Sequence, residues 1–189
     1  GVYACRILVP GMSDIYPAED LLLANNNMGA NLREVILALP SLEWESDQYM
    51  ALFDQLDEEG HDERTRVREL LGIAAAKGTA LHTLRVGELK AMLALAAGEL
   101  ETALDLIDWT MEFNQSVFPA DRANYYRALR ACVELFIDEE RDPEQYRAVF
   151  TRMYGEETLA HAWANARGEA RFHGLEAADL SLSLFPLHQ

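Results

Sequence analysis

Residues 88–113, ELKAMLALAAGELETALDLIDWTMEF, decide the fold that this sequence predicts. Apolar residues in the first half recur at the spacing of one helix face: Leu89, Met92, Leu93 and Ala96. Gly98 follows them, and glycine is the residue that ends a helix at the lowest conformational cost. Because the turn is short, the helix after it must run antiparallel to the first, and the stretch predicts an αα-hairpin.

The second helix of this hairpin carries two apolar stripes side by side. One stripe is Leu100, Ala103, Leu104, Ile107 and Met111, and the other is Leu106, Trp109 and Phe113. A helix with two adjacent stripes buries more than half of its circumference, so it needs a neighbour on each side. We therefore expect this second helix to be the shared wall of a helical stack, and we expect a charge at Leu104 or Ile107 to unfold that stack.

Helical periodicity runs from Met28 to Gly168 almost without a break. Caps, prolines and glycines divide it into further helices. We expect these at residues 32–39, stopped by Pro40; 46–59, capped by Ser46; 62–74, capped by Asp62; 119–136, introduced by Pro119; 142–154, introduced by Asp142 and Pro143; and 159–166. Together with the hairpin, the pattern predicts an all-α fold of roughly eight helices joined by short loops.

The N-terminal stretch does not follow this helical pattern. Residues 2–9, VYACRILV, are typical of a strand that stops at Pro10 and Gly11. A lone strand cannot satisfy its backbone hydrogen bonds. We therefore expect residues 1–27 to be the C-terminal remnant of a preceding domain and residues 28–189 to form the helical domain. A first residue that is not Met fits a piece of a longer chain.

The hairpin is similar to a tetratricopeptide (TPR) unit at three small-residue positions, Ala91, Gly98 and Ala103, but it departs from that pattern at Lys90 and Ala94. A single helix pair of this kind cannot bury its apolar face alone, and stacking of several pairs is the remedy. We expect a TPR-like stack of antiparallel helical hairpins.

The charge balance limits the partners. Lys and Arg number 16 and Asp and Glu 32, so the formal net charge is −16. Nucleic acids and anionic membranes are bound through Lys and Arg, and the excess of carboxylates argues against both. Apolar runs such as residues 92–97 fall far short of the roughly 20 residues that cross a bilayer. Cys5 and Cys132 form no motif and fit a reducing compartment, so we expect a cytoplasmic protein.

No group of residues carries a recognisable chemistry. Residues 57–63, DEEGHDE, place carboxylates around His61 but lack the spacing of a metal or acid–base site, which favours a solvated loop. The five histidines show no paired spacing, and no serine, threonine or cysteine lies in a nucleophile motif. The sequence therefore assigns no catalytic, cofactor-binding or metal-binding residue.

Positive charge gathers on one predicted helix, at Arg122, Arg127 and Arg130. These residues could dock an acidic segment. Pairing with carboxylates of the same and neighbouring helices is the favoured interpretation.

Several stretches together resemble one family. Residues 2–21, VYACRILVPGMSDIYPAEDL, resemble the end of the catalytic domain in YcaO proteins of the Escherichia coli type. Four later stretches resemble the helical C-terminal domain of the same group: DQLDEEGHDERTRVRELLGIA, TLRVGELKAMLALAAGELETAL, WTMEFNQSVFPADRANYYR and RMYG.

This resemblance implies both an activity and partners. YcaO proteins bind ATP and magnesium in their N-terminal domain, and many activate peptide amides, as in azoline formation. The group resembled here is described as an accessory factor for β-methylthiolation of an aspartate in ribosomal protein S12 by the radical-SAM enzyme RimO. The family's ATP and magnesium residues precede this chain, so none falls on a residue here. Residues 185–189, FPLHQ, do not match the proline-rich C-terminus of azoline-forming members, which argues against cyclodehydratase activity.

Three hypotheses follow for the function. The first is a non-catalytic helical domain that mediates partner docking or homodimerisation of an ATP-using YcaO protein, with RimO or ribosomal protein S12 as candidate partners. The second is a stand-alone TPR-like adaptor. The third is an enzyme whose site is assembled from scattered carboxylates.

Overall fold

The structure is a computed structural model that describes residues 29–73, 75 and 78–175. The strand expected at residues 2–9, the preceding-domain remnant and the end of the tail lie outside the described residues. Within them the chain is helical, as predicted. The elements are α2 (Arg33–Ala38), η1 (Leu39–Ser41), α3 (Ser46–Glu58), α4 (Val67–Leu71), α5 (Ala80–Thr83), α6 (Val86–Ala97), α7 (Leu100–Phe113), α8 (Ala120–Ile137), η2 (Pro143–Gln145), α9 (Arg147–Tyr154) and α10 (Glu156–Ala166).

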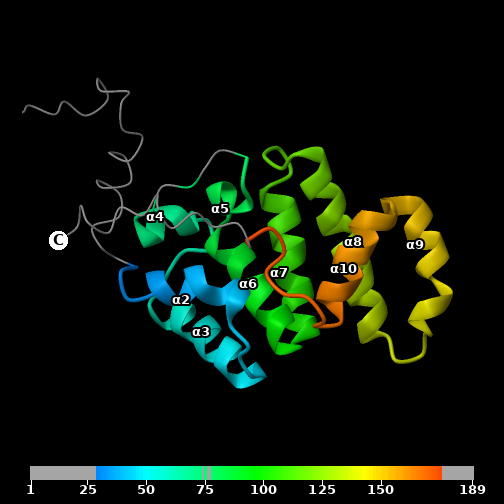
Figure 1. The fold of residues 1–189 in the computed structure, drawn as a ribbon, viewed down its shortest axis with the longest axis horizontal. Coiled ribbons are helices and arrows are strands. Elements are labelled where there is room, and N and C mark those ends of the chain that lie inside the picture. Colours follow the sequence, from blue (N-terminus) through cyan, green and yellow to red (C-terminus); the bar gives the residue numbers. More distant parts are fainter. Residues whose placement is uncertain (1–28, 74, 76–77, 176–189) are drawn as a thin grey trace, which may run out of the picture.

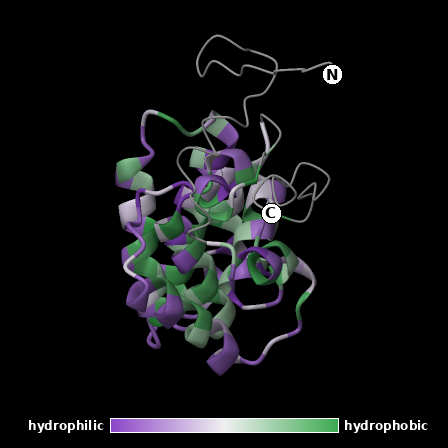
Figure 2. Cartoon of the chain, turned by 90° about the vertical axis from the view of Figure 1, so that its left-hand side faces the viewer, coloured by the Kyte–Doolittle hydropathy of each residue, from purple (hydrophilic) through white to green (hydrophobic). Residues whose placement is uncertain are grey.

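The predicted hairpin is present and consists of α6 and α7. Gly98 joins them at φ 83°, in the left-handed region that glycine adopts without strain. Around this pair the helices pack in a row, with α3 against α6 on one side and α8 against α7 on the other (Figure 1). Helix α10 then packs on α8, and α9 lies at the far end. Hydrophobic residues gather in the helical body and hydrophilic residues occupy much of its outline (Figure 2).

The most completely buried helix of the stack is α6, not α7. Every residue from Val86 to Ala96 is buried, whereas α7 fully buries only Ala103, Ile107 and Thr110. The expectation that the two-striped second helix has a neighbour on each side is confirmed, since α7 packs against α6 and α8, but α6 is the more completely buried helix. Small side chains explain the difference, because they let neighbours approach α6 from several sides. A Cβ at Gly87 would lie 2.5 Å from the Trp109 ring of α7.

Two of the helix starts that differ from those predicted have a clear local cause. The N-cap of α3 is Glu45, which forms a reciprocal capping box with Gln48, while the Ser46 hydroxyl donates to the Ala97 carbonyl instead. Helix α4 begins at Val67, after the expected Asp62 cap, because residues 65–67 pair with residues 84–86 through an isolated antiparallel bridge.

The apolar face predicted for α9 is only partly covered. Tyr146 and Phe150 pack against the core, but Val149 and Met153 are 54% and 61% exposed. The two helices on either side of it match the sequence better. Helix α8 buries the predicted Tyr125, Leu129, Cys132 and Val133, and α10 buries Leu159, Ala162, Trp163 and Ala166.

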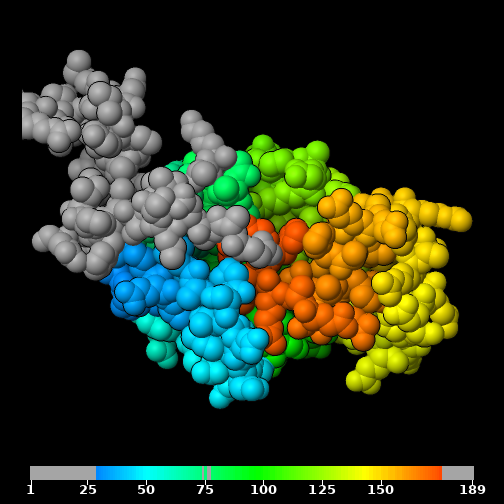
Figure 3. Space-filling model, viewed as in Figure 1, coloured from blue at the N-terminus to red at the C-terminus, as the bar shows by residue number. Residues whose placement is uncertain are grey.

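The segment after α10 returns along the stack to its first helices. Arg171 donates to the Tyr49 hydroxyl of α3 over 3.1 Å, and its guanidinium lies 5.2 Å from the centre of the Tyr49 ring. Phe172, 1% exposed, packs on the same ring at 5.8 Å between centroids. It does so at φ 53°, a costly conformation for a bulky residue, so its burial must offset that strain. Figure 3 shows this segment, in orange-red, lying between α3 and α10.

Because α6 is more completely buried than α7, a Leu→Ala substitution should lower the free energy of unfolding more in α6 than in α7. Leu93→Ala should lower the free energy of unfolding by about 3 kcal/mol, because Leu93 is fully buried and its neighbours on both sides hold the cavity open. Leu104→Ala, at a partly buried position of α7, should cost about 1 kcal/mol. Urea unfolding followed by circular dichroism measures both values. Equal losses would contradict the assignment of α6 as the more completely buried helix.

Candidate binding cleft

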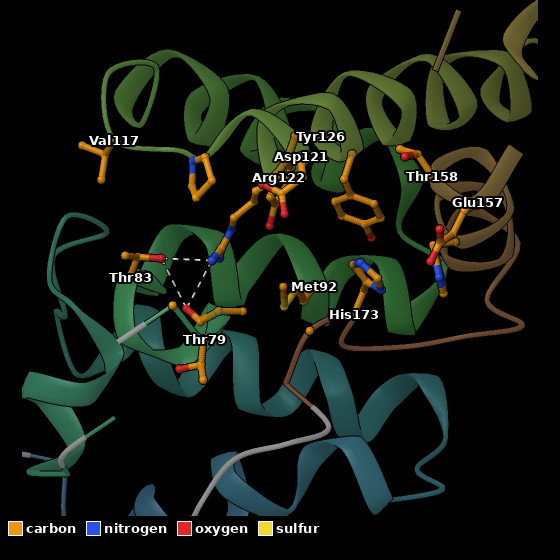
Figure 4. Close-up of a pocket in the computed structure, with 16 residues that line it drawn as sticks. Thr79, Thr83, Met92, Val117, Asp121, Arg122, Tyr126, Glu157, Thr158 and His173 are labelled. Carbon is orange, nitrogen blue, oxygen red and sulfur yellow. Dashed lines mark hydrogen bonds between the residues drawn. The ribbon is translucent and has the colours of Figure 1, made fainter. Parts of the chain in front are cut away.

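A cleft of about 530 Å³ opens where α5, α8, α10 and the returning segment meet over α6 (Figure 4). Helix α5 and the residues before it supply Thr79 and Thr83, and α6 supplies Met92. The remaining polar walls come from α8, α10 and the returning segment: Asp121, Arg122, Tyr125, Tyr126, Glu157, Thr158, His161 and His173. Segments far apart in the sequence thus surround one space.

A buried charge cluster lies beneath this cleft. Glu88 of α6 is fully buried, and its Oε1 accepts hydrogen bonds from the Arg122 guanidinium and, over 2.5 Å, from the Tyr126 hydroxyl. Arg122 also donates to the Thr83 hydroxyl over 2.9 Å and to the Ala80 carbonyl over 3.3 Å. The guanidinium is therefore used to connect α5, α6 and α8.

The environment of this cluster shifts the pKa values of Arg122 and Tyr126. Burial lowers the pKa of Arg122, but the charge of Glu88 outweighs it and the net shift is upward. Burial, and then the charge of Glu88, raise the pKa of Tyr126 well above its ordinary value. Arg122 stays charged and Tyr126 stays neutral, so the cluster is a structural ion pair that offers no acid or base near neutral pH.

The structure brings together two histidines that the sequence did not pair. The rings of His161 and His173 lie 4.7 Å apart between centroids, and Tyr125 stacks on His173 at 4.3 Å. His161 belongs to α10 and His173 to the returning segment. Their proximity depends on the chain reversal after α10, and no local spacing in the sequence signals such a reversal.

The cleft has the shape of a binding site, and part of its polar lining is already used by the fold. Of its hydroxyls, that of Thr83 accepts from Arg122 and donates to the Ala80 carbonyl. Outside the cleft, Cys132 is fully buried, and burial raises the pKa of its thiol to about 12, so it is a packing residue as expected. Cys5 lies outside the described residues.

The carboxylate-rich stretch 57–63 serves a structural purpose. Asp57 and Glu63 accept hydrogen bonds from the buried Lys90 ammonium over 2.5 and 3.1 Å, and Glu59 contacts His61 at 2.8 Å. In the part of the chain that the structure describes, no three His, Cys, Asp or Glu residues are grouped so that they could hold a metal ion.

The helical arginines divide between two roles. Arg122 is buried against Glu88, and Arg130 pairs with Asp108 at 2.6 Å and with Glu134 at 2.8 Å. Pairing with neighbouring carboxylates is thus confirmed for both. Arg127 is exposed on α8.

None of the described helices has the length and apolar character needed to cross a membrane.

Comparisons with known proteins agree on one family. The sequence profile described as the YcaO cyclodehydratase C-terminal domain matches residues 29–189. The chain is 59% identical over all of its 189 residues to the ribosomal protein S12 methylthiotransferase accessory factor YcaO of Escherichia coli K12, covering 32% of that protein. It is 53% identical over the same length to an uncharacterized protein of Haemophilus influenzae, again covering 32%. The chain thus spans about a third of these relatives.

The buried pair beneath the cleft predicts a large loss of stability when one charge is removed. Glu88→Gln should cost about 3 kcal/mol, because it leaves the Arg122 guanidinium buried without a countercharge. Glu101→Gln, at an exposed site on α7, is the matched control and should change stability by less than about 0.5 kcal/mol. Urea unfolding of both variants gives the comparison, and similar losses would show that Glu88 is not held as described.

Lys90 predicts a specific dependence of stability on alkaline pH. Burial lowers the pKa of Lys90, but hydrogen bonds to Asp57 and Glu63 outweigh burial and raise it above 10.5. The stabilisation is therefore complete below pH 10.5 and is lost as the pH rises through the folded-state value. The stability difference between the protein and Lys90→Met should narrow above pH 10.5 in urea titrations. Tyrosine ionisation affects both proteins alike, so a constant difference would refute the prediction.

Proposed function

The chain belongs to the YcaO family, and from this membership we propose that it is the non-catalytic interaction domain of an ATP-dependent YcaO protein. That protein would act as an accessory factor in β-methylthiolation of ribosomal protein S12. The observation that carries the proposal is the 59% identity, over every residue of the chain, to a relative named as the S12 methylthiotransferase accessory factor.

The proposed domain division follows the same comparison. Residues 1–27 would be the C-terminal end of a YcaO catalytic domain, and residues 28–189 the helical TPR-like domain. ATP and magnesium would bind to the part of the longer protein that precedes this chain, as the resemblance to YcaO proteins implies. The longer protein would be cytoplasmic and would form a homodimer.

A binding role suits the chemistry of the cleft. The buried charges beneath it are paired with one another, and the hydroxyl of Thr83 is used in the same network. A space lined by polar groups that the fold already holds in place favours recognition over catalysis. A stand-alone TPR-like adaptor is the second candidate, and an enzyme with a carboxylate-based site is the less favoured third.

The charge of the chain supports a basic partner. A protein that binds ribosomal RNA needs an excess of Lys and Arg. Ribosomal protein S12 would therefore be attracted to a chain with a net charge of −16, and the attraction would speed association at low salt. RimO is the other proposed partner.

A domain replacement tests the proposal in cells. In an Escherichia coli strain whose accessory factor has its C-terminal third replaced by this chain, S12 should carry the β-methylthio group at the wild-type level, as measured by mass spectrometry. A factor that lacks this third is the control, and it should fail to support modification. Full modification in the control strain would show that the domain is not needed for the reaction.

A binding experiment separates the three candidates. Titration calorimetry of the chain alone with ATP and magnesium should give no heat of binding, whereas purified S12 or RimO should bind to the longer protein. ATP turnover by the chain alone would instead favour the enzyme hypothesis. Light scattering of the longer protein tests the proposed homodimer.

A further inference from the structure

Two arginines face each other across the isolated bridge between residues 66 and 85. The flanking hydrogen bonds run from Val67 N–H to the Leu84 carbonyl (2.9 Å) and from Val86 N–H to the Thr65 carbonyl (3.0 Å). This pattern makes Arg66 and Arg85 a non-hydrogen-bonded antiparallel pair, in which opposite side chains lie closest together on one face. Like charges in such a pair repel, so the bridge holds an unfavourable contact in place.

Arg64 and Arg68 add two further positive charges beside this pair. The guanidinium groups of Arg64 and Arg85 lie 5.5 and 4.8 Å from the centre of the Phe113 ring. Arg68 follows Arg66 on the first turn of α4. We refer to Arg64, Arg66, Arg68, Arg85 and Phe113 as the arginine surface.

The carboxylates among the residues that the structure describes do not neutralise this surface. Glu69 is the partner that the described residues provide, at 3.1 Å from Arg66 and 3.6 Å from Arg68. The nearby acidic side chains are used elsewhere, since Asp62 accepts the Arg64 backbone N–H and Glu63 binds Lys90. Arg85 donates to neutral oxygens, the Asn114 side chain and the Arg64 carbonyl.

The repulsion between these arginines affects their pKa values. Burial lowers the pKa of Arg68 and of Arg85, and the charge of Arg66 lowers both further. A chain with 32 acidic residues thus places four arginines together, with Glu69 as the carboxylate that the described residues pair with two of them. An arriving carboxylate would relieve that repulsion and would gain charge-assisted hydrogen bonds.

The same surface carries an exposed aromatic side chain. Phe113 is 37% exposed, and two guanidinium groups lie beside its ring. Arginine beside an exposed aromatic side chain is a combination that protein interfaces favour.

We propose that the arginine surface docks an acidic segment of a partner protein, with a carboxylate between Arg64 and Arg85 and an apolar side chain against Phe113. The inference rests on the proposed interaction role and names the chemistry of one partner. A nucleic acid fits less well, because the net charge of −16 repels a long polyanion while a short carboxylate segment feels mainly the local field.

Peptide probes test this surface on the complete protein. A labelled peptide of alternating glutamate and leucine should bind, with affinity that falls as salt is added, and a glutamine–leucine peptide should not. Arg64→Glu should weaken binding by about tenfold in fluorescence polarisation, since it replaces an attraction with a repulsion. Arg127→Glu, the same charge change at an exposed site on α8, should alter binding by less than about twofold.

Several results would overturn the proposal. Equal effects of Arg64→Glu and Arg127→Glu, or equal binding of the glutamine peptide, would show that the arginine surface does not recognise a carboxylate. Tighter binding of a thymidine oligonucleotide would assign the surface to nucleic acid, and loss of self-association in Arg64→Glu without loss of peptide binding would assign it to a second copy. Phe113→Ala should also weaken peptide binding. Because it changes no charge, it tests the same surface even if Arg64→Glu fails to fold.

The proposed function is tested separately by measuring S12 and RimO association in the same variants. If Arg64→Glu leaves peptide binding intact while these proteins still bind, the surface assignment fails and the proposed function stands. If neither protein binds and peptide binding behaves as expected, the proposed function fails alone.

Discussion

The structure depends on burying α6 on all sides. A helix enclosed in this way must bury the charged residues of its sequence together with the apolar ones, and α6 contains Glu88 and Lys90. A buried charge without a partner costs several kcal/mol, so each needs a countercharge from another segment. Glu88 obtains it from Arg122 of α8, and Lys90 obtains it from the end of α3 and the loop that follows. The need to pair the charges of Glu88 and Lys90 thus favours α8 and the end of α3 as neighbours of α6.

This requirement also explains the character of the cleft. Its most polar feature, the Arg122 guanidinium, is held by Glu88, Thr83 and Ala80 before any ligand arrives. Groups fixed by the fold can shape and orient a bound segment, but they have little freedom to exchange protons. The arginine surface differs in this respect, since Arg64 and Arg85 contact an aromatic ring and neutral oxygens in place of a carboxylate.

Periodicity predicted the helices well because local spacing determines which face of a helix is apolar. It also predicted the Gly98 turn, which depends only on backbone conformation. It failed to identify α6 as the most completely buried helix, because burial of Glu88 and Lys90 depends on residues 27 to 38 positions away. The His161–His173 contact was missed for a similar reason. The alternating arginines of residues 64–68 have the period of a strand, so the spacing of helix faces does not reveal them.

The return of the chain after α10 has a consequence for how the molecule unfolds. In an open row of helical hairpins each unit touches only its neighbours, so the ends can fray while the middle remains folded. Here Arg171 and Phe172 attach the last part of the row to Tyr49 in one of its first helices, 122 residues earlier for the Arg171 bond. The row is thereby closed into a ring of contacts. Neither end can detach without breaking the closure, so the described part of the chain should unfold as one cooperative unit.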